Sequence, residues 1–158
     1  MQILTTGLSV NAAFLQEIKE DNQELRLLFR QVSRHLYKIS ERLLYRRELF
    51  ELAVRLRDQL AMHFALEEAF GYFNDAIDTA PHLSEKAEEL KADHSRLFVK
   101  ICHICDAAET VLHAPGSMSE VAAVADLFDV FAGRFHDHEA RENQLILEAF
   151  DDDIGCCD

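Results

Sequence analysis

Apolar residues recur at spacings of three and four along four long stretches of the chain, and no stretch shows the strict alternation typical of a half-buried strand. This spacing predicts four amphipathic helices. Pro81 and the Pro115-Gly116 pair interrupt the pattern between the last three stretches, and a tight turn near residues 38–42 separates the first two. Because short connections make consecutive helices antiparallel, we expect an all-α fold, an up-down-up-down four-helix bundle. The apolar stripes run from Ile18 to Ile39, Leu49 to Phe73, Leu90 to Leu112 and Val121 to Ala149.

The predicted bundle spans residues 17–150, with an N-terminal extension over residues 1–16 and an acidic tail over residues 151–158. Only five glycines and two prolines occur in 158 residues, which excludes an all-β fold rich in turns. The four cysteines form two close pairs, one in the third helix and one in the tail. Neither pair has the spacing of a zinc motif or of a secreted disulfide framework, so their role stays open.

The charge balance is strongly acidic, with 29 acidic against 16 basic residues and a formal net charge of −13. This balance argues against nucleic acid as a partner. Arg26, Arg30 and Arg34 recur every four residues and form a basic ridge on the first helix, which is either a solvated face or a docking surface for an acidic protein partner. No apolar run is long enough to span a membrane, and residues 1–14 lack the basic residues of a secretory signal, so we expect a cytoplasmic protein.

Five polar residues interrupt the apolar stripes at positions that face the core. His63 and Glu67 lie in the second stripe, His94 lies in the third, and His138 and Glu142 lie in the fourth. Each would cost a few kcal/mol if it were buried without a partner, and an ionised carboxylate would cost more. Something must therefore compensate these groups.

The five polar residues are also predicted to lie at one level of the bundle. Residues equidistant from a short loop are level in antiparallel helices, and the midpoints of His63 with His94 and of His94 with His138, at 78.5 and 116, both fall in predicted loops. Three neutral imidazoles and two carboxylates suit borderline first-row metals, and the carboxylates can bridge two ions. The alternative is a buried histidine–carboxylate hydrogen-bond network without metal.

The sequence resembles the hemerythrin-like family, also called HHE cation-binding domains. HFALEEAFGYF from His63 and HEARENQLILEAF from His138 look like its two His-x-x-x-Glu blocks, and LKADHSRLF looks like its block with a single histidine, His94. The resemblance covers residues 14–150 and implies two non-haem iron ions, with or without an oxo or hydroxo bridge. It makes His63, His94 and His138 terminal ligands and Glu67 and Glu142 bridging ligands. The ferritin-like alternative is not supported, because no histidine has a glutamate three residues before it.

The first block departs from the family pattern. In IKEDNQELRLLF, Asn22 occupies the place of the family's first histidine. Asn22 could ligate weakly, hold a water or leave an open coordination position. His35 is a possible substitute, although its midpoint with His63 falls inside the second helix rather than in a loop. Glu68 is expected to point away from the metal layer into solvent.

The preferred functional hypothesis is a di-iron protein that binds O2, another small diatomic molecule or peroxide for sensing, storage or delivery. One alternative is a di-iron enzyme that acts on peroxide or nitric oxide, and another is an iron storage or donation protein. The sequence does not decide whether the protein is an enzyme. It also leaves open whether one metal or two are bound.

Overall fold

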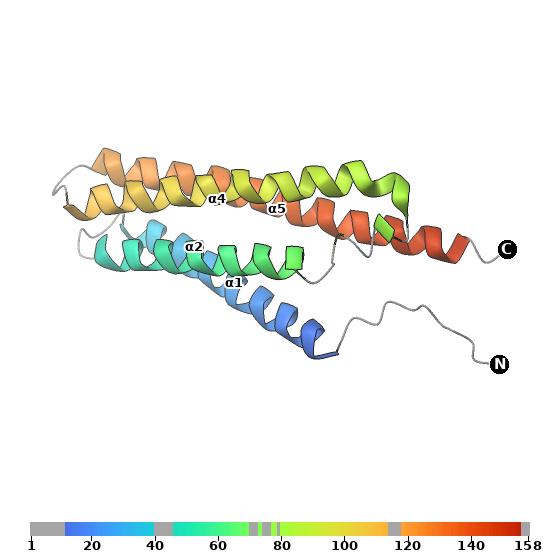
Figure 1. The fold of residues 1–158 in the computed structure, drawn as a ribbon. Helices are drawn as coiled ribbons and strands as arrows, with labels where there is room; N and C mark the ends of the chain where they lie inside the picture. The colour runs from blue at the N-terminus through green and yellow to red at the C-terminus, as the bar shows by residue number, and fades with distance from the viewer. Residues whose placement is uncertain are drawn as a thin grey trace.

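The computed structural model describes residues 12–39, 46–69, 73, 77–78, 80–113 and 118–155, and these contain helices and no strand (Figure 1). The predicted all-α fold class is confirmed. Helical backbone extends past the predicted limits of the bundle at both ends, whereas residues 1–11, the predicted turn after residue 39 and the tail cysteines lie outside the described residues. The elements are α1 (Ala12–Ile39), α2 (Arg46–Ala69), the short 3-10 helix η2 (Pro81–Leu83), α4 (Ser84–His113) and α5 (Met118–Gly155).

Consecutive helices run in opposite directions along the bundle (Figure 1). Helices that follow one another in the sequence pack closely, whereas α1 and α5, which close the bundle, are in much looser contact. The N-terminal half of α1 diverges from the rest of the bundle (Figure 1). The bundle is therefore tight on three sides and looser between α1 and α5. No described helix is long and apolar enough to cross a membrane.

Pro81 sets the start of the second half of the bundle. It stands at the first position of η2, where its missing N–H group leaves no helical hydrogen bond unmade. The N–H of Leu83 donates to the carbonyl of Ala80 at 2.9 Å, and α4 begins at the next residue. This tight turn fixes the level at which α4 starts, and hence the height of His94 in the bundle.

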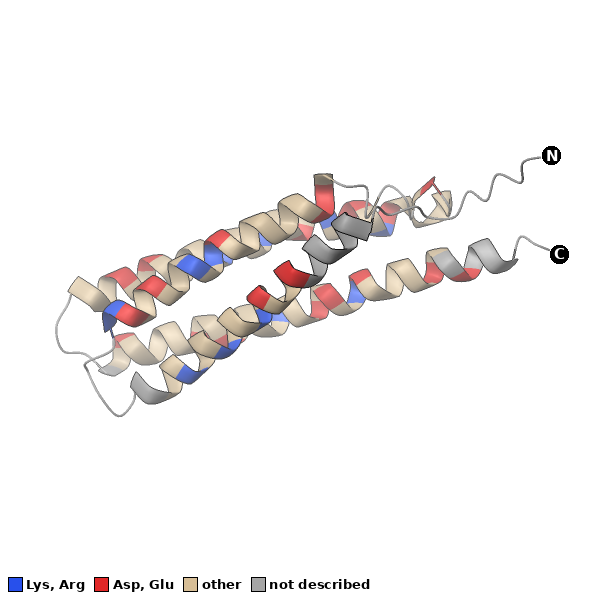
Figure 2. Cartoon of the chain, turned by 90° about the horizontal axis from the view of Figure 1, so that it is seen from below, with Lys and Arg blue, Asp and Glu red and all other residues tan. Residues whose placement is uncertain are grey.

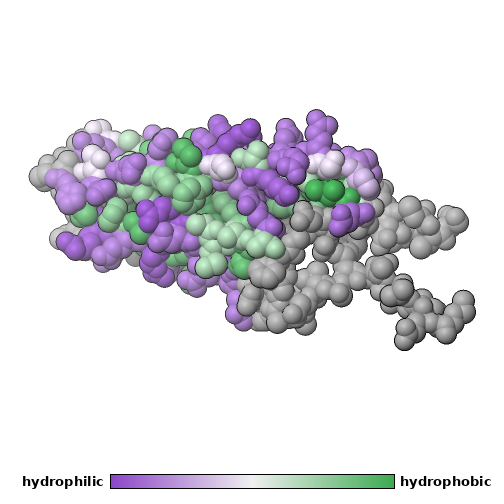
Figure 3. All heavy atoms as spheres, in the orientation of Figure 1, coloured by the Kyte–Doolittle hydropathy of each residue, from purple (hydrophilic) through white to green (hydrophobic). Residues whose placement is uncertain are grey.

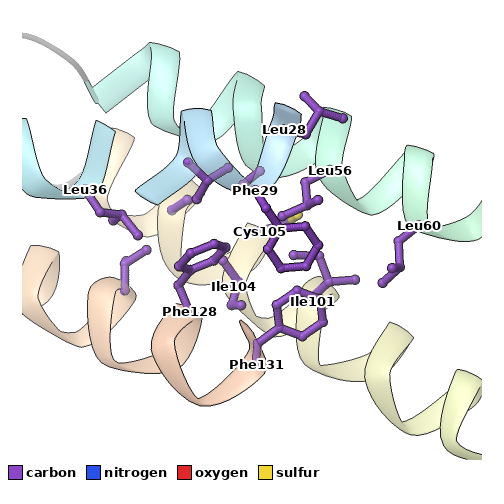
Figure 4. Packing of buried hydrophobic residues seen from close by; sticks show 14 of the residues in the cluster. Leu28, Phe29, Leu36, Leu56, Leu60, Ile101, Ile104, Cys105, Phe128 and Phe131 are labelled. Atoms are coloured by element: carbon purple, nitrogen blue, oxygen red, sulfur yellow. The ribbon is translucent and has the colours of Figure 1, made fainter. Parts of the chain in front are cut away.

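The larger apolar cluster of the core centres on aromatic rings from α1 and α5 (Figure 4). Phe29 stacks on Phe131, with ring centroids 5.6 Å apart, and on Phe135 at 4.9 Å. Phe128 lies 5.9 Å from the same Phe29 ring. These contacts join α1 to α5, so the few places where the two helices meet are held by large apolar surfaces.

A second apolar cluster lies at the other end of the described bundle. Along α4 its Leu90 comes four residues before His94, and along α5 its Leu145 comes three residues after Glu142. The larger cluster begins on the other side, at Leu97 of α4 and Phe135 of α5. The polar layer is thus enclosed between two apolar clusters. The second cluster consists of Phe73, Ala80, Leu83, Ala87, Leu90, Leu145 and Ala149.

Charged residues cover the outside of the helices (Figure 2), and hydrophilic side chains surround apolar ones on the face seen in Figure 3. Along α1 the acidic residues come first and Arg26, Arg30 and Arg34 follow, all three exposed. The predicted basic ridge is therefore present on the surface over this part of α1.

Phe131→Ala should destabilise the protein by about 3–5 kcal/mol, because it removes a fully buried ring that stacks on Phe29 and leaves a cavity. Its neighbour provides the control, since Val130 is 55% exposed and Val130→Ala should change stability by less than about 0.5 kcal/mol. Urea unfolding followed by circular dichroism measures both variants. Equal effects of the two substitutions would contradict the packing described here.

Candidate metal centre

The structure brings the five predicted polar residues to one buried layer. Each of them is at most 5% exposed. Ligand atoms of Glu67, His94, His138 and Glu142 all lie within 4.8 Å of one another, and His63 adjoins this group through Glu67. The layer draws on α2, α4 and α5, as the spacing of the residues predicts.

The five side chains form a continuous series of nitrogen–oxygen contacts. One oxygen of Glu67 lies 2.9 Å from Nε2 of His63, and its other oxygen lies 3.3 Å from Nε2 of His94. Oε1 of Glu142 lies 3.3 Å from the same His94 nitrogen and 2.7 Å from Nε2 of His138. Glu67 therefore connects two histidines through two different oxygens, which is the geometry that a bridging carboxylate requires.

Several atoms of this series have no hydrogen bond among the described residues, although they are fully buried. They include Nε2 of His63, Oε2 of Glu67 and Nε2 of His138. Carboxylate oxygens lie 2.9 Å from the His63 nitrogen and 2.7 Å from the His138 nitrogen, but not in directions that make a hydrogen bond. Buried polar atoms normally find a well-directed partner, so the layer needs an explanation. Imidazole nitrogen and carboxylate oxygen are suitable ligands for a first-row divalent cation, and the residues present fit such an ion.

Asp21 of α1 is a buried member of the site that the sequence analysis missed. Its Oδ2 lies 2.6 Å from Nδ1 of His63, and Nε2 of Gln59 donates to its Oδ1 at 2.6 Å. Asn22, which takes the aligned place of the family's first histidine, is only half-buried and lines a groove between α1 and α5. A signal for Asp21 was present in the sequence, because it lies four residues before the buried Leu25.

Glu68 is exposed, as predicted, but the prediction that it points away from the layer is wrong. Its side chain is 49% exposed, yet Oε1 lies 2.7 Å from Nδ1 of His94. The side of α2 that carries Glu68 turns toward α4, which packs closely against it. A residue one position past a core residue can therefore still reach a neighbouring helix.

Asp93 occupies the corresponding outer position beside His138. Its Oδ2 lies 3.7 Å from Nδ1 of His138. Two arginines hold this carboxylate, since Arg96 donates to it at 2.8 Å and Arg141 donates to its other oxygen. Burial raises the pKa of Asp93, but the two arginines outweigh burial and lower it.

His63 and His94 share one arrangement, in which Nδ1 is hydrogen-bonded to an outer carboxylate and Nε2 faces the interior of the layer. His138 differs, because Asp93 lies 3.7 Å from its Nδ1, which has no hydrogen bond among the described residues. A carboxylate at Nδ1 favours the tautomer that keeps a lone pair on Nε2, and such pairs orient histidines that bind metals. His35 is not part of this arrangement, because it lies 3.4 Å from Glu48, away from the layer.

Apolar rings border the layer. Phe64 stacks on His94, with ring centroids 4.1 Å apart and planes 11° apart. Phe135 lies edge-on to His63 at 6.1 Å. These rings keep water away from the imidazoles and restrict their rotation.

Burial and charge act in opposite directions on the ionisable groups of the layer. Burial lowers the pKa of His63, but its contacts with Asp21 and Glu67 outweigh burial and raise the pKa to about 10. His94 behaves alike, with a pKa of about 9 that results from Glu142, Glu67 and Glu68. Burial raises the pKa of Glu67, but contacts with His63 and His94 lower it to about 2. The carboxylates therefore demand positive charge, from protons on the imidazoles or from a cation.

Protein stripped of metal by a chelator should be most stable between about pH 4.5 and 6.5. His63 and His94 have pKa values raised from 6.5, so their contribution is complete below 6.5 and is lost as the pH rises through 9 and 10. Glu67 has a pKa lowered from 4.5, so its contribution is lost as the pH falls toward 2. Urea midpoints across this pH range measure the effect, and Asp21→Asn should flatten the alkaline decline. A midpoint that rises from pH 7 to pH 10 would contradict this assignment.

Comparison with known proteins agrees with the geometry. The family model of the hemerythrin HHE cation-binding domain matches residues 13–150, which is most of the chain. Searches of curated proteins and of solved structures find no significant match. The long match, the all-helical bundle and the buried histidine–glutamate layer lead to one conclusion: the chain belongs to the hemerythrin HHE cation-binding domain family.

Proposed function

We propose that this protein holds two iron ions in the buried layer and reversibly binds O2 or a related small molecule for sensing, storage or delivery. The observation that carries the proposal is the series of contacts from His63 through Glu67, His94 and Glu142 to His138. Its carboxylates sit between imidazole nitrogens, and several of its buried atoms lack hydrogen bonds within the described residues.

The proposed ligands are those that the sequence analysis predicts: His63, Glu67, His94, His138 and Glu142. Bound iron would supply a redox-active centre for O2, nitric oxide or peroxide. The chain's own residues would prepare that centre. Asp21 and Glu68 orient His63 and His94, Asp93 lies near His138, and Phe64 and Phe135 exclude water from the rings of His94 and His63.

The apolar borders favour small, weakly polar ligands over large polar substrates. A stacked phenyl ring on His94 leaves little room on that side of the layer, and the two apolar clusters close the bundle above and below it. The enzyme alternative, which acts on peroxide or nitric oxide, uses the same centre and differs only in turnover. Iron storage or donation would require ions that leave the site readily.

The basic ridge of Arg26, Arg30 and Arg34 supports a second, separate proposal, that an acidic protein partner docks there. The three side chains are exposed and line one wall of the groove between α1 and α5. They concentrate positive charge on a chain whose formal net charge is −13. Such a surface would attract an acidic partner most strongly at low ionic strength.

His138→Ala should weaken iron binding by about tenfold or more, because it removes a buried donor that contacts Glu142. Two residues away, His136 is exposed, so His136→Ala provides the matched control and should bind iron as the wild type does. Glu67→Gln, which preserves shape, should also reduce binding. Metal analysis of purified protein measures all three variants, and full iron content in His138→Ala would rule out the assigned ligands.

The iron-loaded protein should show an absorption band on exposure to O2 that bleaches under vacuum and returns on re-exposure. Repeated cycles without loss are expected if the site binds O2 reversibly. Multiple-turnover consumption of peroxide or nitric oxide would favour the enzyme alternative instead. Rapid loss of iron to a mild chelator would favour storage or donation.

A further inference from the structure

The two ends of the polar layer differ in the number of possible metal-ligand atoms that they contain. At one end His94, His138, Glu67 and Glu142 bring ligand atoms within 4.8 Å of one another. At the other end, Nε2 of His63 has Glu67 at 2.9 Å. Nε2 of His63 is nevertheless buried and without a hydrogen bond among the described residues. A cation bound at this end would need a further ligand from the protein.

Helix α1, where the family pattern has a histidine, does not supply that ligand in this arrangement. Asp21 contacts Nδ1 of His63, on the edge of the ring opposite Nε2. It is also engaged by Gln59. Asn22 lines the groove between α1 and α5 and is not among the residues gathered in the buried cluster.

A donor from α5 does reach this end. Oε1 of Glu139 lies 3.6 Å from Nε2 of His63, and its side chain is 29% exposed. Glu139 precedes Glu142 by three residues, so both carboxylates project from the same side of α5. One glutamate thus faces the His94 end of the layer while the other faces the His63 end.

We propose that Glu139 completes the binding of the second cation, together with His63 and the shared carboxylate of Glu67, in place of the histidine that this chain lacks at Asn22. The inference rests on the proposed function and specifies its second metal position. The ion is a divalent first-row cation such as Fe(II), which accepts a mixture of imidazole and carboxylate ligands.

The charges around Glu139 support the same assignment. The carboxylates of Glu142 and Glu67 lie near Glu139, as do His63 and Arg26. Three carboxylates that lie close together repel one another unless positive charge lies among them. A divalent cation among them would replace that repulsion with attraction.

The groove between α1 and α5 gives this position a route to solvent. It has a volume of about 720 Å³ and is lined by Glu139 and Phe135 of α5 and by Asn22 and Arg26 of α1, among others. Glu139 therefore borders both the groove and the buried His63 ring. An ion entering by the groove meets the Glu139 carboxylate before it reaches His63.

Anaerobic calorimetric titration with Fe(II) tests the inference. We expect the wild type to bind two equivalents, and we expect Glu139→Gln to keep the first step while the second weakens by about tenfold or more. Glu139→Asp, which retains the charge on a shorter side chain, should give an intermediate second step. Glu109→Gln makes the same change at an exposed position of α4 and should bind as the wild type does. Circular dichroism establishes that each variant is folded.

The outcomes separate this inference from the proposed function. Two unchanged steps in Glu139→Gln would overturn the inference and make Glu139 an ordinary solvated carboxylate. A single equivalent in the wild type that is lost in His138→Ala would overturn it too, while the remaining ligand assignment would hold. A wild type that binds no Fe(II) would instead overturn the proposed function itself.

Discussion

Two carboxylates buried at the middle of an apolar bundle are the constraint on which the rest of this structure depends. Glu67 and Glu142 are at most 5% exposed, and an ionised carboxylate in such surroundings is very unfavourable unless positive charge lies close to it. Charge can come from protons on His63 and His94 or from cations between the side chains. Protons would satisfy the charge through contacts such as that of His63 with Glu67, and a cation would in addition give the poorly directed nitrogen and oxygen atoms a shared partner. The apolar clusters on either side keep water away from the two carboxylates, so the carboxylates continue to require a nearby positive charge.

The outer carboxylates follow from the chemistry of the imidazole ring. A histidine that offers Nε2 to the interior must place Nδ1 somewhere, and a carboxylate there fixes both the tautomer and the ring orientation. Asp21 of α1 and Glu68 of α2 perform this role for His63 and His94, whereas Asp93 of α4 lies 3.7 Å from Nδ1 of His138. These carboxylates have different hydrogen-bond partners: Gln59 donates to Asp21, and two arginines donate to Asp93. Together they tie all four helices to the layer, because α1 contributes through Asp21 even though it supplies no donor to the Nε2 side.

The sequence predicted the layer well and its surroundings poorly, for a physical reason. Short loops and a period of 3.6 residues determine which residues are level and which face the core, and these two facts located His63, Glu67, His94, His138 and Glu142. The periodicity defines directions only relative to each helix's own axis. Whether a residue at the border of a stripe contacts a neighbouring helix or faces solvent depends on how that helix is rotated about its axis. The sequence pattern does not contain this rotation. Asp21 was passed over in favour of Asn22, Glu68 was assigned to solvent, and Glu139 was not considered, and all three lie at such borders.

The looseness between α1 and α5 gives the layer two unlike ends. At the end formed by His94 and His138, Phe64 stacks on His94 and two arginines hold Asp93, and a pocket of about 480 Å³ between α4 and α5 is lined by Asp93 and His138. Around His63, Glu139 lies between the ring and a groove whose far wall carries Arg26, Arg30 and Arg34. Those arginines would attract an anion that enters the groove, and the Glu139 carboxylate would attract a cation. The two ends of the layer therefore have different surroundings: Glu139 separates His63 from the wide groove between α1 and α5, whereas His138 itself lines a smaller pocket between α4 and α5.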